Sequence, residues 1–159
     1  MSSTCNVTRN LEYSCIDYLR DNLQSGMSLN VEKSFEKIYA KPLPSLFLRV
    51  EDTSYDFAEI GSDLVTRKPI LYVDLFCQNE GQRMDYKDWF VLILRTGFPY
   101  YDYVIANNGT VSSKTVNGRV KVLEIRDTPL SFLDNRDKLD IHDLYRSQIV
   151  MTLSLGRVE

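Results

Sequence analysis

The spacing of apolar side chains predicts two helices in this chain. In residues 11–23 apolar positions recur every three to four residues, which is the period of a helix that buries one face. Gly26 follows and suits the C-terminal cap of that helix. Residues 82–95 form the second predicted helix, which ends before Gly97. Because residues 89–94 are apolar nearly all round, we expect this helix to need more cover than one sheet face provides.

The rest of the chain has the two-residue alternation of β-strands. Residues 27–31, 46–50 and 55–60 predict three short strands. Residues 70–77 are apolar on both faces, which is typical of a strand covered on two sides, so we place them at the centre of the sheet. Residues 148–158 alternate again and predict the last strand.

Two turns are predicted in the second half of the chain. Residues 107–110 carry the composition of a turn. Asn117-Gly118 is a strong signal for a two-residue hairpin, because a type I′ turn needs positive φ at both positions. The predicted arms of this hairpin are residues 111–116 and 119–125. We therefore expect a β-hairpin centred on Asn117-Gly118.

The pattern as a whole predicts a single domain over residues 1–159. No repeat, linker or low-complexity tract divides the 159 residues. The expected fold class is α+β, with a mixed, mostly antiparallel sheet, helices packed on it and one hairpin. The chain has no apolar run of membrane-spanning length and no secretory signal, so we expect a protein made in the cytoplasm.

The charge of the chain argues against tight binding of DNA or RNA. The net charge is -3, and the 19 basic residues are scattered among 22 acidic ones. Proteins that grip phosphates need clustered Lys and Arg, because each neutralised phosphate requires one. We expect no sequence-specific nucleic-acid binding.

Candidate metal ligands and catalytic residues are few. The cysteines Cys5, Cys15 and Cys77 are odd in number and form no CxxC pair, and His142 is the only histidine. Zinc needs about four N or S ligands at close spacing. We therefore expect three buried thiols, an exposed histidine, no metal and no cofactor.

One arrangement of carboxylates leaves an enzymatic alternative open. Asp74 on the central strand, with Glu124 and Lys121 in the second half, suits a metal-dependent nuclease. Such sites have an acidic residue, one further residue and then a lysine. Here the order is reversed, because Lys121 precedes Glu124 by three positions. Asp74 is better explained as a polar residue of the sheet, and we expect the protein not to be an enzyme.

Aromatic residues supply the candidate contact surface. The chain has ten tyrosines and seven phenylalanines, many of them in residues 98–103. Tyrosine is enriched where proteins meet, because it combines a large apolar ring with a polar tip. A strand whose tyrosines alternate between core and solvent is the equal alternative. The candidate interface residues are Tyr55, Phe57, Tyr100, Tyr101, Tyr103, Asn117 and Arg119.

The order of segments resembles that of tail-terminator, or tail-completion, proteins of tailed bacteriophages. The resemblance covers about residues 10–155 and rests on diffuse, mostly apolar motifs. They are Pro-Ser-Leu-Phe-Leu-Arg-Val at 44–50, Ala-Glu-Ile-Gly-Ser at 58–62, Pro-Ile-Leu-Tyr-Val-Asp-Leu-Phe at 69–76, Gly-Gln-Arg at 81–83, Gly-Phe-Pro-Tyr-Tyr-Asp-Tyr at 97–103 and Tyr-Arg-Ser-Gln-Ile-Val-Met-Thr-Leu at 145–153.

This resemblance implies a non-enzymatic virion protein at the head-proximal end of the tail. Such subunits form a ring, usually a hexamer, which docks on the last ring of the tail-tube protein and stops tail growth. The ring presents a surface to the head-closure or connector protein, and DNA passes through its lumen. One of two segments, the long polar stretch 127–143 or the hairpin region 106–118, would then face the channel or the neighbouring subunit. The alternatives are a head-closure ring, a tail-tube subunit or a baseplate adaptor.

Overall fold

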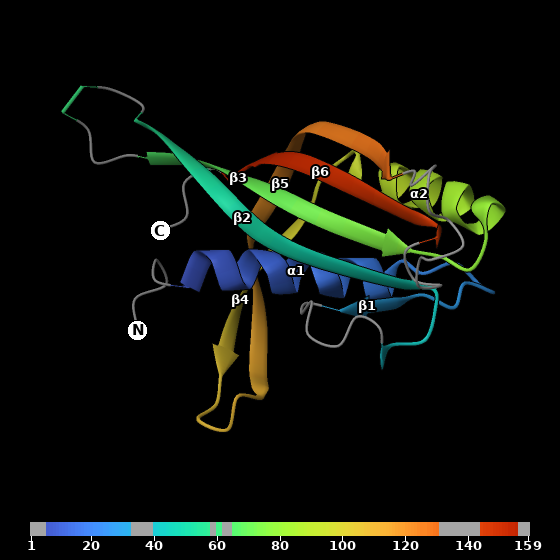
Figure 1. Cartoon of the computed structure of the whole chain (residues 1–159). Coiled ribbons are helices and arrows are strands. Elements are labelled where there is room, and N and C mark those ends of the chain that lie inside the picture. Colours follow the sequence, from blue (N-terminus) through green and yellow to red (C-terminus); the bar gives the residue numbers. More distant parts are fainter. Residues whose placement is uncertain (1–5, 33–39, 58–59, 62–64, 131–143, 156–159) are drawn as a thin grey trace.

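The computed structural model describes residues 6–32, 40–57, 60–61, 65–130 and 144–155. Over these residues the chain has the predicted α+β fold, with two helices and one six-stranded sheet (Figure 1). The elements are α1 (Val7–Asp21), β1 (Asn30–Glu32), β2 (Ser45–Phe57), β3 (Val65–Phe76), α2 (Glu80–Leu94), β4 (Phe98–Ile105), β5 (Val111–Leu130) and β6 (Arg146–Ser154).

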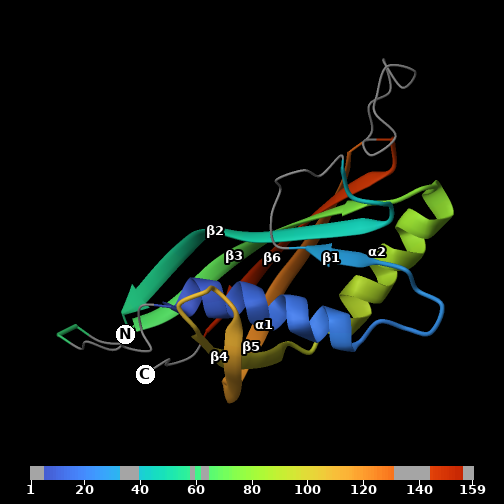
Figure 2. The same ribbon diagram turned by 90° about the horizontal axis from the view of Figure 1, so that it is seen from below.

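The sheet is mixed but mostly antiparallel, as the sequence predicts. Its strand order is β1-β2-β3-β6-β5-β4, and only β1 and β2 run parallel. The strand β5 pairs with β4 along its first half and with β6 along its second half. The sheet therefore bends along β5 and curves into a half-barrel, with α1 across its concave face (Figure 2).

The core lies between the concave face of the sheet and the two helices. The prediction that residues 70–77 are central is confirmed, because β3 lies between β2 and β6. Alternate residues of β3 and β6 share the concave face, where Leu71 is opposite Met151 and Val73 is opposite Ile149. All four side chains are fully buried. They meet the buried stripe of α1, which consists of Val7, Leu11, Cys15, Ile16 and Leu19.

The helix α1 ends earlier than the sequence predicts. It stops at Asp21, and Asn22 provides its C-cap. The side-chain amide of Asn22 donates to the carbonyl oxygen of Tyr18 at 2.7 Å, and the backbone N–H of Asn22 donates to the same oxygen at 3.2 Å. Gly26 has the positive φ of 88° expected of a turn, but it lies beyond this cap.

The helix α2 begins with two side-chain capping bonds. The side chain of Asn79 accepts from the backbone N–H of Gln82 at 2.8 Å, and the side chain of Gln82 accepts from the backbone N–H of Gln78 at 2.9 Å. Only one face of the helix is buried, and its buried residues are Trp89, Phe90 and Leu94. The expectation that this helix needs more cover than one sheet face provides stays a prediction, because Met84 and Leu92 are about half exposed in the single chain.

The segments 46–50 and 55–60 were predicted as separate strands, but residues 45–57 form one strand. A β-bulge lies between Val50 and Asp52, and the polar residues after it stay paired with β3. This pairing needs only backbone hydrogen bonds, so polar side chains do not interrupt it. The result is a long β2–β3 hairpin that extends past the core (Figure 1).

The hairpin predicted at Asn117-Gly118 is also wrong. Both residues lie inside β5, where two residues of β5 oppose the single residue Tyr100 of β4. This is a β-bulge that uses the positive φ of Gly118, 97°, for a bend rather than a reversal. The chain reverses instead between β4 and β5, where the N–H of Ala106 donates to the carbonyl oxygen of Thr110 at 2.9 Å. The turn predicted at 107–110 is thus confirmed.

The predicted polar loop 127–143 overlaps β5. Its first four residues continue β5, with Asp127 opposite Ile149 and Leu130 opposite Arg146. Residues 131–143 lie outside the described part of the chain. The last predicted strand is confirmed as β6, with Ile149, Met151 and Leu153 on its buried face.

Candidate functional site

Two hairpins project from the core in different directions (Figure 1). One is the β2–β3 arm, which we define as residues 52–57, 60–61 and 65–68. The other is the β4–β5 hairpin, whose strands are paired from Phe98 and Val120 to Ile105 and Val111. The arm holds Tyr55 and Phe57 outside the core, whereas the base of the β4–β5 hairpin contributes Phe98 and Val120 to the core.

The β2–β3 arm exposes large apolar side chains. Tyr55 is 56% exposed, Phe57 is 69% exposed, and Ile60 is fully exposed. Lys68 forms an ion pair with Asp56, and the guanidinium of Arg67 lies 5.9 Å from the centre of the Tyr55 ring. Clustered exposed apolar residues on a soluble surface mark interaction sites more often than single ones do. This arm is therefore the first part of the candidate site.

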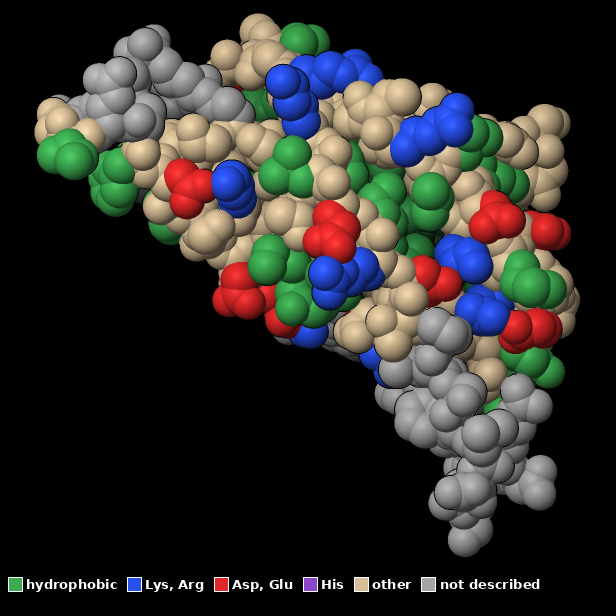
Figure 3. Space-filling model, turned by 90° about the horizontal axis from the view of Figure 1, so that it is seen from above, with side chains coloured by type: hydrophobic (Ala, Val, Ile, Leu, Met, Phe, Trp, Pro, Cys, Tyr) green, Lys and Arg blue, Asp and Glu red, His purple; other side chains and the backbone are tan. Residues whose placement is uncertain are grey.

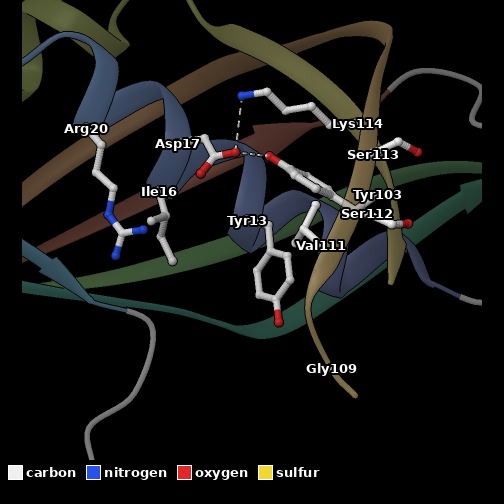
Figure 4. Close-up of a pocket in the computed structure, with 10 residues that line it drawn as sticks. All are labelled: Tyr13, Ile16, Asp17, Arg20, Tyr103, Gly109, Val111, Ser112, Ser113 and Lys114. Atoms are coloured by element: carbon white, nitrogen blue, oxygen red, sulfur yellow. Dashed lines mark hydrogen bonds and ion pairs between the residues drawn. The ribbon is translucent and has the colours of Figure 1, made fainter. Parts of the chain in front are cut away.

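A pocket of about 550 Å³ lies between α1 and the β4–β5 hairpin (Figure 4). Its apolar surface comes from aromatic and branched side chains of α1, β4 and β5, and its polar surface from serines and charged side chains. It is lined by Tyr13, Ile16, Asp17, Arg20, Tyr103, Gly109, Val111, Ser112, Ser113 and Lys114. Its volume suits one or two large side chains or a small molecule.

Asp17 organises the polar part of the pocket (Figure 4). Its Oδ2 accepts a hydrogen bond from the Tyr103 hydroxyl at 2.7 Å and lies 3.4 Å from the Nζ of Lys114. Burial and the bond to Asp17 raise the pKa of Tyr103, so this phenol stays a neutral donor. The edge of the Tyr13 ring packs on Tyr103, with the ring centres 5.5 Å apart.

The remaining polar groups of the pocket are held by the fold. Arg20 donates to the carbonyl oxygen of Val31 at 2.7 Å, and Ser112 donates to that of Val104 at 2.9 Å. The lining residues include no histidine or cysteine. The pocket can bind a ligand or a side chain by shape and charge.

The tyrosines of β4 that were predicted to form an interface differ in how deeply they are buried. Tyr100 is 1% exposed within the single chain, so its assignment to an interface is wrong, whereas Tyr103 is 6% exposed and lines the pocket. The reason is that β4 packs directly on α1, where the hydroxyl of Ser14 accepts from the N–H of Tyr101 at 2.9 Å. Tyr101 is half buried, and the Nζ of Lys114 lies 4.9 Å from its ring centre.

The other proposed interface residues differ in role. Tyr55 and Phe57 lie on the arm and are exposed. Asn117 is exposed, but its amide donates to Asp102 at 2.7 Å and fixes the bulge to β4. Arg119 donates to the carbonyl oxygens of Thr96 at 3.2 Å and Gly97 at 3.1 Å, which ties the end of α2 to β5. The pocket was not predicted from the sequence, because the residues that line it from α1 and those from the β4–β5 hairpin are about ninety positions apart.

The carboxylates of the nuclease alternative do not converge. Asp74 is opposite Gln148 and Glu124 is opposite Thr152, four residues further along β6. Asp74 is 1% exposed and bonded to Arg146, whereas Glu124 is exposed and bonded to Arg126 at 2.6 Å. Within the described residues no group of three or more His, Cys, Asp or Glu side chains could hold a metal ion.

The thiols that the structure describes are buried. Burial raises the pKa of the Cys15 thiol and raises that of Cys77 to about 12. Both are therefore poor nucleophiles and poor metal ligands near neutral pH. This confirms the prediction for two of the three cysteines, since Cys5 lies outside the described residues, as does His142.

The face of the molecule opposite α1 carries mixed charges. Figure 3 shows basic and acidic side chains interspersed across this face, without a large region of one sign. Some neutralise each other within one strand, as in the pairs Arg49–Glu51 of β2 and Arg126–Glu124 of β5. In the described part of the chain, neither helix is long and apolar enough to cross a membrane.

Comparison with known proteins adds no assignment. No protein-family model matches this chain. No curated protein sequence matches it significantly. The arm and the pocket are therefore interpreted from their own geometry.

Proposed function

We propose that this chain is a structural subunit of a bacteriophage tail that assembles into a ring, caps the tail tube and joins it to the head. The observation that carries the proposal is the β2–β3 arm, in which Tyr55, Phe57 and Ile60 are exposed outside the core. The order of segments in the sequence, which resembles that of tail terminators, supplies the specific identity.

Two unlike surfaces on one subunit are what a ring requires. In a ring each copy presents one patch to the neighbour on one side and a different patch to the neighbour on the other. The apolar arm and the pocket beside α1 are two such unlike surfaces. A two-fold dimer would instead need one self-complementary patch.

The chemistry of the described residues favours an assembly role over catalysis. The carboxylate that the nuclease alternative needs, Asp74, is buried in an ion pair with Arg146, and the pocket lining includes no histidine or cysteine. The mixed charges of the face opposite α1 also suit a wall past which DNA travels without being held. The proposed partners are further copies of the chain, the tail-tube protein and the head-closure or connector protein.

Immunogold labelling tests this proposal. A gold-labelled antibody against the chain is applied to intact virus particles, to isolated tails and to isolated heads. We expect label at the head-proximal end of particles and of isolated tails. Label on isolated heads alone would indicate a head-closure ring. Label along the tube, label at the distal tip or an absence of label from particles would overturn the proposal in favour of a tube subunit, a baseplate adaptor or a non-virion protein.

A further inference from the structure

We infer that the pocket between α1 and the β4–β5 hairpin binds a carboxylate with a single negative charge that carries an aromatic or branched apolar group. The inference goes beyond the proposed function, because it assigns a ligand chemistry to a pocket built by one chain, whether or not the chain forms rings. Every residue that lines the pocket belongs to the described part of the chain.

The apolar surface of the pocket comes from both of its walls. Tyr13, Ile16 and Arg20 are three and four residues apart, so their side chains extend from the same face of α1 (Figure 4). On the hairpin side the lining includes Val111, which is 49% exposed. An aromatic or branched group that enters between the two walls is removed from water together with these side chains, which favours its binding.

The charges of the lining favour a ligand with one negative charge. The lining has two basic residues, Arg20 and Lys114, and one acidic residue, Asp17, which leaves a net charge of +1. Lys114 is already engaged, because its Nζ lies 3.4 Å from Asp17 and 4.9 Å from the centre of the Tyr101 ring. Among the lining residues, the positive charge that no carboxylate balances is therefore that of Arg20.

The fold positions Arg20 to bind a carboxylate. The guanidinium donates to the carbonyl oxygen of Val31 at 2.7 Å, and this bond holds it beside the pocket although the side chain is exposed. A guanidinium has five N–H donors in one plane, so a bond to one carbonyl leaves donors for both oxygens of a carboxylate. Because the cation is already held in place, less side-chain freedom is lost when the ligand binds.

The same arrangement disfavours a phosphate ester. The Asp17 carboxylate belongs to the same lining and lies three residues before Arg20 on α1. A phosphate ester carries close to two negative charges at neutral pH, so it would bring a second charge that repels Asp17. A carboxylate brings only the one charge that the lining can balance. We therefore expect a carboxylate to bind more tightly than a phosphate ester of similar size.

Titration of the full chain with three probes tests this ligand chemistry. The probes are phenylacetate, its neutral isostere phenylacetamide, and phenyl phosphate, and binding is followed by NMR of the isotope-labelled protein at neutral pH. We expect phenylacetate to bind at least roughly tenfold more tightly than either other probe, because hydrogen bonds between charged partners are stronger than neutral ones. The chemical shifts that change should centre on the backbone amides of Gly109, Ser112 and Ser113.

Two variants of the lining and one control locate the ligand. Arg20→Gln removes the positive charge but keeps a hydrogen-bond donor, so phenylacetate should lose its advantage over phenylacetamide. The control Arg126→Gln changes an exposed charge of β5 outside the pocket, and it should keep that advantage. Val111→Asp changes an exposed side chain, so it tests the site even if Arg20→Gln is unstable, and its added charge should abolish phenylacetate binding.

Several outcomes would overturn the inference. They are equal affinities for phenylacetate and phenylacetamide, tighter binding of phenyl phosphate, no saturable binding, shift changes away from the pocket, or an unchanged preference in Arg20→Gln and Val111→Asp. A further probe, acetyl-Gly-Phe with a free carboxylate, distinguishes two sources of the ligand. If it binds as tightly as phenylacetate, the end of a polypeptide fits the pocket, and if it is excluded, the ligand is a free small molecule.

Discussion

The guanidinium of Arg146 donates to the Oδ1 of Asp74 at 2.8 Å, across the two central strands of the sheet. Asp74 is almost fully buried, whereas the side chain of Arg146 is 25% exposed. Arg146 also lies over the ring of Phe76, 5.0 Å from its centre. The pair therefore connects the start of β6 to the end of β3, on the face opposite the main core.

Replacing Arg146 by Ala should destabilise the protein strongly. The variant leaves the Asp74 carboxylate buried without its charged partner, and removing one member of a buried pair costs about 3–5 kcal/mol. Because Arg146 is partly exposed, we expect a loss near the lower end of this range, measured by urea unfolding at neutral pH.

The exposed pair of Arg126 with Glu124 provides the control for this prediction. Its side chains are 73% and 49% exposed, so Arg126→Ala should cost less than about 1 kcal/mol. Equal losses in the two arginine variants would show that Asp74 is solvated or bonded elsewhere. The same result would reopen its assignment as a functional carboxylate.

The two glycines Gly97 and Gly109 should respond differently to alanine. Both have positive φ, 80° and 82°, which costs an alanine roughly 1–2 kcal/mol. At Gly97 an added Cβ would also lie 2.1 Å from the carbonyl oxygen of Val120, whereas nothing lies within 4 Å at Gly109. Thermal and urea unfolding should therefore show Gly97→Ala to be the more destabilising variant, by about a further 1–3 kcal/mol. Equal effects would mean that β5 does not press on Gly97.

The periodic parts of the fold could be predicted from the sequence. The stripe of α1, the apolar strand β3 and the alternation of β6 all follow from which faces must be buried. These features depend only on local spacing, and each of them was correctly predicted as a helix or as a strand. The α+β class follows from the same pattern.

The errors arose where a local signal has two structural outcomes. Asn117-Gly118 favours positive φ, and both a hairpin turn and a bulge inside β5 use that conformation. The choice depends on β4, whose residue Tyr100 faces the bulge and packs in the core. No periodicity within β5 carries this information, so the sequence alone favoured the commoner turn.

The candidate site was predictable only in part. The exposed pair Tyr55 and Phe57 was found from its aromatic composition. The pocket was not, because Asp17 and Lys114 become neighbours only when α1 packs beside the β4–β5 hairpin. Contacts between residues this far apart depend on the topology of the sheet.

The hydrogen bond from Tyr103 to Asp17 should make stability fall at high pH. The fold raises the pKa of Tyr103 from its ordinary value of 10.0 and so favours the neutral phenol. This contribution is fully present below about pH 10 and is lost as the pH rises through the higher folded-state value. Tyr103→Phe removes both the bond and this titration, at a cost of about 1 kcal/mol near neutral pH.

Urea unfolding of the wild type and the Tyr103→Phe variant, at about pH 7 and again above about pH 10, checks this prediction. The difference in stability between the two proteins should shrink at high pH. A difference that stays constant would show that the raised pKa of Tyr103 does not contribute to stability. Titration of other groups is common to both proteins and cancels in the comparison.

The buried thiols should be unreactive in the native state. Cys15 and Cys77 are buried, and their pKa values are raised, so little thiolate forms near neutral pH. In a Cys5→Ser variant we expect a thiol reagent to react with neither cysteine until denaturant is added. Rapid reaction in native buffer would show that the surrounding core opens on the timescale of labelling.

Exposed and buried aromatic residues should separate assembly from stability. Phe57→Ser changes a side chain outside the core, so its melting temperature should stay within about a degree or two of the wild type, as is usual for surface substitutions. Tyr103→Ser should lower the melting temperature clearly, because it removes a buried ring and the bond to Asp17. Val104→Ser is the matched control, since Val104 is 59% exposed on β4 but does not line the pocket.

Ring formation in these three variants, measured by electron microscopy and sedimentation with tail tubes present, completes the comparison. If the arm forms the subunit contact, Phe57→Ser abolishes rings with its fold intact, whereas Val104→Ser still forms them. Rings in the Phe57→Ser variant would remove the arm from the interface. A large loss of melting temperature in that variant would instead place Phe57 in contacts within its own subunit, contrary to its exposure.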